Sequence, residues 1–102
     1  MTRPRKRRLC RAYDGDRVFK PRSIPMRDLE TTRLELSEFE AMRLCDLEGM
    51  DQSAAGARMG VSRGTVQRLL QRGRAKVLEA ITDNKALLIS KGAPHEDLYP
   101  DG

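Results

Sequence analysis

The chain has 102 residues, 34% of them charged and only 4% aromatic, with no Trp, and this composition excludes a large β-sandwich or a deep catalytic barrel. Its 20 Lys and Arg against 15 Asp and Glu give a formal net charge of +5, which favours a polyanionic partner. No stretch approaches the ~20 apolar residues of a membrane crossing, and no apolar run follows the basic start as in a secretory signal. Two cysteines, Cys10 and Cys45, are too few for a disulfide scaffold. We therefore expect a cytoplasmic protein with reduced thiols and no membrane contact.

The charge is divided into blocks along the chain. Residues 1–27 hold ten Lys and Arg against two Asp, a net +8, and residues 61–82 hold five against one Glu, a net +4. Between them, residues 28–60 carry eight acids against three Arg, a net −5. The total charge thus understates two strongly basic segments that flank an acidic one.

Residues 1–30 are expected to form a basic, largely irregular arm and wrap, with one short extended piece around Val18 and Phe19. The beginning has almost no apolar content, and Pro21 and Pro25 oppose a helix further on. Three interpretations of the arm stay open: contact with a DNA backbone or minor groove, a solvated tail, and a basic targeting signal of the nuclear type. Its basic residues are Arg3, Arg5, Lys6, Arg7 and Arg8.

Residues 31–90 are expected to form one mainly α-helical domain. Alternation predicts a short strand over 32–36, and an apolar run predicts another over 86–89 that pairs with the first, in this chain or in a partner. Ser37, with Glu40 three residues on, matches a capping box and begins a helix over about 37–48. This helix turns Phe39, Met42 and Cys45 inward, with Ala41, Leu44 and Leu47 beside them.

Two more helices are predicted, over about 52–59 and 63–81, with Asp51 and Ser62 as their N-caps. Gly73 is expected to weaken or bend the longer one. The inward line of the longer helix is Val66, Leu69, Leu70, Val77 and Leu78. Residues 91–102 read as a frayed polar tail.

The segment 52–66 is typical of a helix-turn-helix. Small residues, Ala55 and Gly56, allow two helices to cross closely, and Gly60 accepts the backbone conformation of the turn. Ser62 caps the second helix. An ordinary helical hairpin with a solvated face is the structural alternative, and RNA or a protein are alternative partners.

The second helix of this motif would present a polar, basic face suited to the major groove of double-stranded DNA. Arg can bridge O6 and N7 of guanine, and Gln can pair with adenine. The residues expected to contact bases are Arg63, Gln67, Arg68 and Gln71. The residues expected to contact the DNA backbone, together with the arm, are Ser62, Thr65, Arg72, Arg74 and Lys76.

The sequence gives weaker support to the other candidate sites. Cys10 and Cys45 lack metal-ligand spacing, and no nucleophile with a base is visible, so we expect no metal, no cofactor and no enzyme activity. Cys45 reads as a core residue, whereas Cys10 in a basic arm would have an activated thiolate and suggests redox-gated binding. The acidic residues read as a solvated face: they are Glu35, Glu38, Glu40, Asp46 and Glu48.

Several of these features together resemble a small prokaryotic family of predicted DNA-binding proteins. The resemblance covers about residues 1–90 and rests on the order of short motifs rather than on any one. They are Arg3-Pro4-Arg5, Phe19-Lys20-Pro21, Glu40-Ala41-Met42-Arg43-Leu44, Met59-Gly60-Val61-Ser62-Arg63 and Lys85-Ala86-Leu87. The helix block is also similar to the fourth region of bacterial sigma factors, which implies transcriptional control. Two departures are Gly56, where such motifs usually have Ala, and Gly64, which removes a side chain from the reading face.

The sequence thus predicts a sequence-specific DNA-binding transcriptional regulator, nucleoid-associated if the source is prokaryotic. A homodimer on two half-sites about 34 Å apart would compensate for the limited affinity of one module. The 86–89 strand would offer an exposed edge through which two copies could pair. The alternative is an adaptor that docks on transcription machinery through its acidic helix, with only non-specific nucleic-acid affinity. No effector pocket is apparent, so a signal would arrive through another protein, abundance or the thiols.

Overall fold

The computed structural model describes residues 7–11, 17–90 and 96–99. Three α-helices and short strands confirm a mainly helical protein with a small β element. In chain order the elements are β1 (Arg8–Cys10), β2 (Arg17–Phe19), the 3₁₀ helix η1 (Met26–Asp28), β3 (Thr31–Leu34), α1 (Leu36–Met42), the π-helix η2 (Arg43–Leu47), α2 (Gln52–Met59), α3 (Arg63–Thr82), β4 (Ala86–Ile89) and β5 (Glu96–Leu98).

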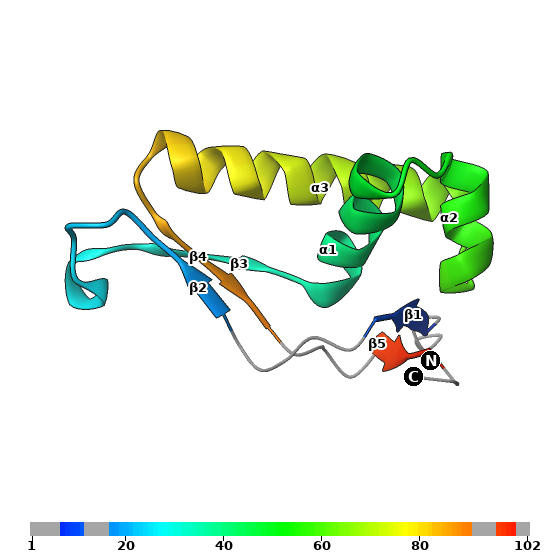
Figure 1. The fold of residues 1–102 in the computed structure, drawn as a ribbon, viewed down its shortest axis with the longest axis horizontal. Coiled ribbons are helices and arrows are strands. Elements are labelled where there is room, and N and C mark those ends of the chain that lie inside the picture. Colours follow the sequence, from blue (N-terminus) through cyan, green and yellow to red (C-terminus); the bar gives the residue numbers. More distant parts are fainter. Residues whose placement is uncertain (1–6, 12–16, 91–95, 100–102) are drawn as a thin grey trace, which may run out of the picture.

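The 20-residue helix α3 runs the length of the molecule (Figure 1). α1 and α2 pack around its N-terminal half, and a small sheet lies beneath its C-terminal half. α3 therefore connects two differently built regions with one unbroken helix.

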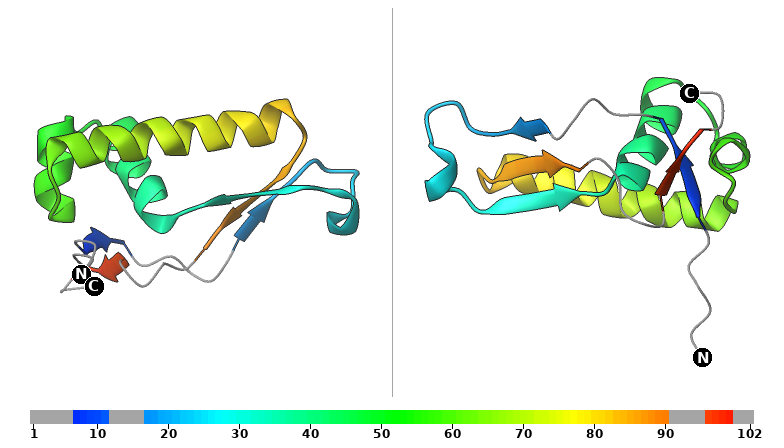
Figure 2. Two further views of the ribbon diagram at one scale, coloured as in Figure 1. Left: turned by 180° about the vertical axis from the view of Figure 1, so that it is seen from behind. Right: turned by 90° about the horizontal axis from the view of Figure 1, so that it is seen from below.

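The small sheet has the order β2-β4-β3, which Figure 2 shows from below. β4 pairs parallel to β3, with Thr31 opposite Ala86 and Leu34 opposite Ile89, so the two strands predicted to pair do so within this chain. β4 also pairs antiparallel to β2, which makes it the central strand. An exposed 86–89 edge available to a second copy was therefore the wrong expectation, because both edges of β4 are already hydrogen-bonded.

The two ends of the described chain meet in a second, two-stranded sheet. β1 and β5 are parallel, with Arg8 opposite Glu96 and Cys10 opposite Leu98, and they lie below α1 and α2 (Figures 1 and 2). The interpretations of 1–30 as largely irregular and of 91–102 as a frayed tail are corrected for β1 and β5, whereas β2 matches the short extended piece expected around Val18 and Phe19. Each segment is too short and polar to predict alone, and each is ordered by a partner distant in sequence.

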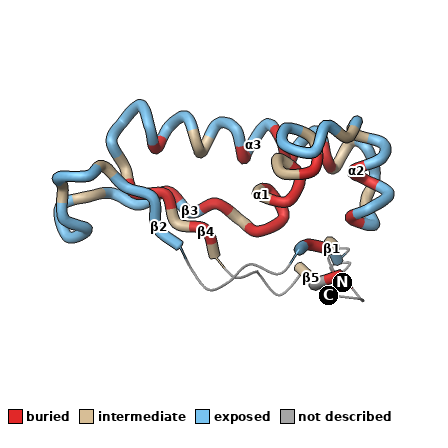
Figure 3. Tube along the Cα trace, viewed as in Figure 1, coloured by how far each residue is buried: buried red, intermediate tan, exposed pale blue. Residues whose placement is uncertain are grey.

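Buried residues form two clusters along α3 (Figure 3). The first, shared with α1, η2 and α2, consists of Ala41, Leu44, Ala55, Met59, Val66, Leu69 and Leu70. The second, shared with the sheet, consists of Leu34, Ala80, Leu87 and Ile89. The predicted inward positions Phe39, Met42 and Cys45 are confirmed, because all three are half-buried and pack against these clusters. Leu47 and Leu78 are exposed, by 81% and 63%.

α1 begins one residue before the predicted start, with Glu35 and not Ser37 as its N-cap. The backbone N–H of Glu35 donates to Glu38 Oε1 at 2.9 Å. Ser37 is fully buried and contacts the strands at the chain ends, since its Oγ accepts from Arg8 Nη1 at 3.3 Å and its N–H donates to Glu96. The predicted capping box was displaced because tertiary contacts use the Ser37 side chain.

Gly73 lies where α3 crosses α1. A Cβ placed there would lie 2.7 Å from Met42 Sδ, so the glycine permits close packing of two helices instead of weakening one. None of the helices described, over residues 7–11, 17–90 and 96–99, has the length and apolar content to cross a membrane.

Candidate nucleic-acid interface

The N-terminal half of α3 has one buried face and one exposed face. Val66, Leu69 and Leu70 lie in the first core cluster. The four residues predicted to contact bases are all exposed: Arg63, Gln67, Arg68 and Gln71. The helix contains no acidic residue before Glu79, so this exposed face is uniformly polar or basic.

The junction between α2 and α3 is built as the local sequence predicts. Asp51 and Ser62 cap the two helices, accepting from the N–H groups of Ala54 at 2.7 Å and Thr65 at 3.1 Å. Gly60 ends α2 at a φ of +71°, a left-handed conformation that favours glycine. These contacts fix the direction in which α3 leaves the turn.

Arg68 is held toward the N-terminus of α3. Its Nη2 donates to Thr65 Oγ1 at 3.2 Å, and Thr65 Oγ1 lies 3.0 Å from Ser62 Oγ. Both hydroxyls are thus already engaged within the helix end. The guanidinium of Arg68 has no carboxylate partner among the described residues, so its charge stays available to a ligand.

The cations predicted to contact phosphates divide into free and paired groups. Arg72 is exposed and forms no ion pair with a described residue. Arg74 binds Asp46 with two bonds of 2.6 and 3.1 Å, and these hydrogen bonds hold the pKa of Asp46 below its ordinary value. Lys76 donates to the buried carboxylate of Glu38 at 2.7 Å. Lys76 therefore compensates the charge of the buried Glu38 carboxylate, and this pairing argues against its predicted contact with a phosphate.

Arg63 has a mixed environment. It lines a shallow depression of about 520 Å³ between α3, α2 and η2, together with Asp46 and Asp51. These carboxylates lower the local positive potential, although neither forms an ion pair with Arg63. Arg68 and Arg72 are consequently the less compensated cations of the α3 face.

The arm is described only from Arg7. Arg3, Arg5 and Lys6 lie outside the described residues. Arg7 is exposed and paired with Asp97, whereas Arg8 is half-buried within β1 and 3.9 Å from Glu35. Arg8 thus holds β1 against α1, and its predicted DNA contact stays a prediction.

β1 places the start of the arm beside the α2–α3 junction. Leu9 lies over the turn, since a Cβ on Gly60 would be 3.7 Å from Leu9 Cδ1. β1 therefore lies beside the end of α2, where the turn toward α3 begins.

Two of the five residues of the predicted acidic face are buried. Glu38 and Glu40 are each only 1% exposed. Glu40 accepts from Arg43 Nε at 2.7 Å, from the Arg11 N–H at 3.1 Å and from the Tyr99 hydroxyl. Asp46 and Glu48 are exposed but form ion pairs with Arg74 and Arg43. The expectation of a solvated face holds for Asp46 and Glu48 and is wrong for Glu38 and Glu40, whose partners include residues from α3, from the segment after β1 and from the segment after β5.

Cys10 is not an exposed thiolate. Its side chain is fully buried, and burial, followed by the nearby carboxylates of Glu96 and Glu40, raises the pKa of the thiol to about 12. A neutral, inaccessible thiol has low reactivity, so redox gating through Cys10 is not supported. Cys45 is half-buried against the first core cluster.

Arg58 is a functional candidate outside the residues predicted to contact DNA. It is exposed on α2, and its guanidinium lies 4.4 Å from the ring centroid of Tyr99, whose hydroxyl binds Glu40. The sequence shows that Arg58 is the one basic residue of the 52–59 helix. Its contact with Tyr99 could not be predicted, because it depends on the position of the segment after β5.

Comparison with known proteins places these features in a family. The model of the family described as "Protein of unknown function DUF134" matches residues 1–97. The chain belongs to this family. Relatives with the name "UPF0251 protein" include one from Aeromonas salmonicida, 42% identical over 92% of each chain, and one from Rhodospirillum rubrum, 41% identical over the whole of this chain and 71% of its own.

Some DUF134 relatives are much longer. A UPF0251 protein from Methanosarcina mazei is 51% identical over 72% of this chain, which is 44% of its own length. No solved structure matches the chain. The comparisons therefore confirm the predicted resemblance to a small prokaryotic family and supply no activity.

Proposed function

We propose that this protein binds double-stranded DNA as a helix-turn-helix transcriptional regulator, in the cytoplasm and associated with the nucleoid. In this proposal α2 and α3 are the two helices of the motif and α3 enters the major groove. Gln67, Arg68 and Gln71 contact base edges, with Arg63 at the margin. Arg72 contacts the DNA backbone.

One observation carries the proposal: the exposed face of the N-terminal half of α3 holds only polar and basic side chains, and neither Arg68 nor Arg72 has a carboxylate partner among the residues that the structure describes. Elsewhere the described chain pairs many of its charges internally, as in Arg43 with Glu40 and Lys76 with Glu38. Uncompensated cations gathered on one helix face are typical of a surface that meets a polyanion.

The position of β1 also supports DNA as the partner. The basic residues before Arg7 continue from a strand that packs beside the α2–α3 turn. An arm attached there can follow the backbone or enter the minor groove while α3 occupies the adjacent major groove.

The adaptor alternative receives less support. It requires an acidic helix that is free to bind a partner, but Glu38 and Glu40 are buried and their charges are compensated within the chain.

The deciding experiment is selection of bound duplexes from a random pool at two salt concentrations. A motif that persists at the higher salt is expected, and a palindromic motif would indicate a homodimer. Binding without a motif, which collapses with salt at a slope near −0.9 per phosphate contacted, would contradict base reading.

Arg68→Ala sharpens the test. It should weaken binding to the selected site by ~1–3 kcal/mol and relax the preference at one position. Arg22→Ala is the matched control, because Arg22 is exposed but lies in the loop after β2 and not on α3. Equal weakening of all sequences by Arg68→Ala would reduce the role of Arg68 to a phosphate contact.

A further inference from the structure

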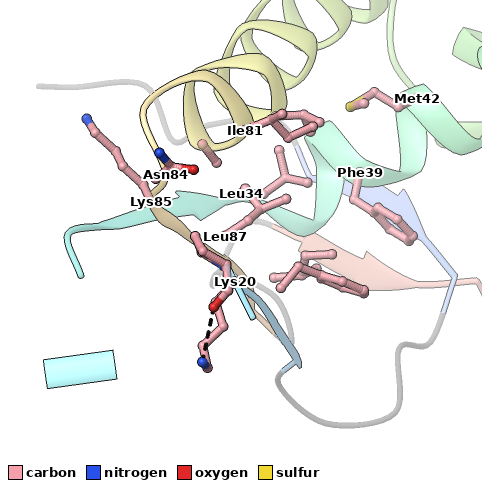
Figure 4. A pocket seen from close by; sticks show the side chains of 13 residues that line it. Lys20, Leu34, Phe39, Met42, Ile81, Asn84, Lys85 and Leu87 are labelled. Atoms are coloured by element: carbon pink, nitrogen blue, oxygen red, sulfur yellow. Dashed lines mark hydrogen bonds between the residues drawn. The ribbon is translucent and has the colours of Figure 1, made fainter. Parts of the chain in front are cut away.

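Two hollows in the surface of the described residues differ in the chemistry of their walls. One, of about 530 Å³, lies between α1, the C-terminal half of α3 and the three-stranded sheet, and apolar side chains such as Leu34, Phe39 and Leu87 dominate it (Figure 4). The other, of about 420 Å³, lies between η2, α2 and the segments that follow β1 and β5. The second hollow carries the more selective chemistry, because arginines dominate its wall.

The arginines of the second hollow come from three separate segments of the chain. Arg11 follows β1, Arg43 begins η2, and Arg58 lies near the C-terminal end of α2. The other residues that line the hollow are Leu44, Glu48, Met50 and Tyr99. Three guanidinium groups therefore face a single carboxylate in this lining. No contiguous segment encodes the wall, and for this reason the sequence predicted no effector pocket.

The carboxylates at and beneath the hollow are already engaged. Arg43 Nε donates to Glu40 Oε1 at 2.7 Å, and Arg43 Nη1 lies 3.4 Å from Glu48 Oε1. The buried Glu40 also accepts from the backbone N–H of Arg11 at 3.1 Å and from the hydroxyl of Tyr99. These contacts use both carboxylates within the floor of the hollow, where they compensate Arg43.

Arg11 and Arg58 are the cations of the hollow that such contacts leave uncompensated. Both are exposed, and neither forms an ion pair with any residue that the structure describes. The guanidinium of Arg58 lies 4.4 Å from the ring centroid of Tyr99, and this contact orients the group without neutralising it. A guanidinium presents its N–H donors in a planar fork that matches the oxygens of a phosphate.

We propose that this hollow binds a phosphate group between the guanidinium groups of Arg11 and Arg58. A volume of about 420 Å³ falls within the ~300–1,000 Å³ of small-molecule sites, so the hollow also has room for the body of a phosphorylated small molecule against Leu44 and Met50. The proposal does not rest on the proposed function, because none of the residues proposed to contact DNA lines the hollow.

The first test titrates the full chain with inorganic phosphate, in two-dimensional ¹H–¹⁵N NMR, with sodium chloride holding the ionic strength constant. Saturable shifts are expected for the backbone and side-chain Nε–Hε signals of Arg11 and Arg58. Shifts that never saturate, or that are equally large at the exposed Arg22 outside the hollow, would overturn the proposal.

Variants of the two arginines assign the contact. Arg11→Gln removes one guanidinium but keeps the backbone N–H that binds Glu40, so the fold should be retained. Arg11→Gln and Arg58→Gln should each weaken phosphate binding about fivefold, as expected for a partly exposed ion pair. Arg22→Gln is the matched control and should leave the affinity unchanged. An unchanged affinity in either hollow variant would contradict the proposed contact, and Arg11→Gln decides alone if Arg58→Gln fails to fold.

Two sources supply a phosphate group of this kind: a free phosphorylated small molecule and the DNA backbone. A titration with phenyl phosphate, with and without saturating duplex, separates them. For a small-molecule site, the duplex should leave the affinity for phenyl phosphate unchanged, and Arg58→Gln should not alter the salt dependence of DNA binding. For a backbone site, the duplex should displace phenyl phosphate, and Arg58→Gln should reduce the salt slope by about 0.9. Absence of DNA binding would remove only this second comparison, because the first titration contains no DNA.

Discussion

Gly56 of α2 lies directly against the carbonyl oxygen of Val61 in the turn before α3. A Cβ placed on Gly56 would be 2.7 Å from that oxygen, which belongs to the backbone and cannot rotate away. The close approach explains why this chain departs from the alanine usual in similar motifs.

The first prediction follows from this contact. Gly56→Ala should lower the free energy of unfolding by ~1–3 kcal/mol, because the clash outweighs the ~1 kcal/mol gained in helix propensity. Gly64→Ala is the matched control: its Cβ would meet only Arg68 Nη1 at 3.7 Å and Ser62 Oγ at 3.9 Å, so it should be neutral or stabilising by up to ~1 kcal/mol. Urea unfolding of both variants measures the difference. Equal effects of the two substitutions would contradict the packing described.

Substitution of Lys76 should lower the stability of the protein, whereas substitution of Arg72 should weaken its binding to DNA. Lys76→Met removes the partner of the buried Glu38 and should destabilise the protein by ~1–3 kcal/mol, with little change in DNA affinity. Arg72→Met should change stability by less than ~0.5 kcal/mol and reduce the slope of DNA binding against salt by about 0.9. Chemical unfolding and salt-dependent binding assays give the two readouts. A salt slope reduced by Lys76→Met would return Lys76 to the DNA-binding surface.

Cys10 should make the fold sensitive to alkaline pH. The thiol ionises near its ordinary pKa of 9.0 in the unfolded chain, whereas burial raises the pKa to about 12 in the folded one. Only the unfolded state releases this proton between those values, so the stabilisation is complete below about pH 9 and is lost as pH rises toward 12. The loss is at most ~1.4 kcal/mol per pH unit.

Unfolding free energies measured between pH 8 and about pH 11 test this linkage. Cys10→Ala should flatten the decline that begins near pH 9. Tyr99 adds a later decline, because burial and the hydrogen bond to Glu40 raise its pKa above the ordinary value of 10.0. An unchanged pH profile in Cys10→Ala would show that the thiol is accessible to solvent.

Tyr99 should anchor the C-terminal strand through two separable contacts. Tyr99→Phe removes the hydroxyl bonded to Glu40 but keeps the ring beneath Arg58, and should cost ~1 kcal/mol. Tyr99→Ala removes both contacts together with a buried ring and should cost ~3 kcal/mol or more. Thermal and urea unfolding compare them. Equal losses in the two variants would mean that the ring contributes nothing to the fold.

Local rules were sufficient for the α2–α3 region. Asp51 and Ser62 cap the two helices at the predicted positions, and Gly60 adopts the left-handed conformation of the turn. Val66, Leu69 and Leu70 are buried on one face of α3, as their helical spacing predicts. Each of these features depends on residues within about four positions of one another, so the sequence alone determines them.

Tertiary contacts decided which charged side chains are buried and how the two ends of the described chain pair. Glu38 and Glu40 have the spacing of a solvated face, yet partners from α3 and the segment after β1 make their burial tolerable. Cys10 is buried because β1 pairs with β5 and packs against α1 and α2. Such outcomes depend on contacts between residues tens of positions apart, which periodicity and capping do not encode. The sequence by itself therefore determined the helices and the polar face of α3, and only the tertiary structure decided which cations on that face remain free.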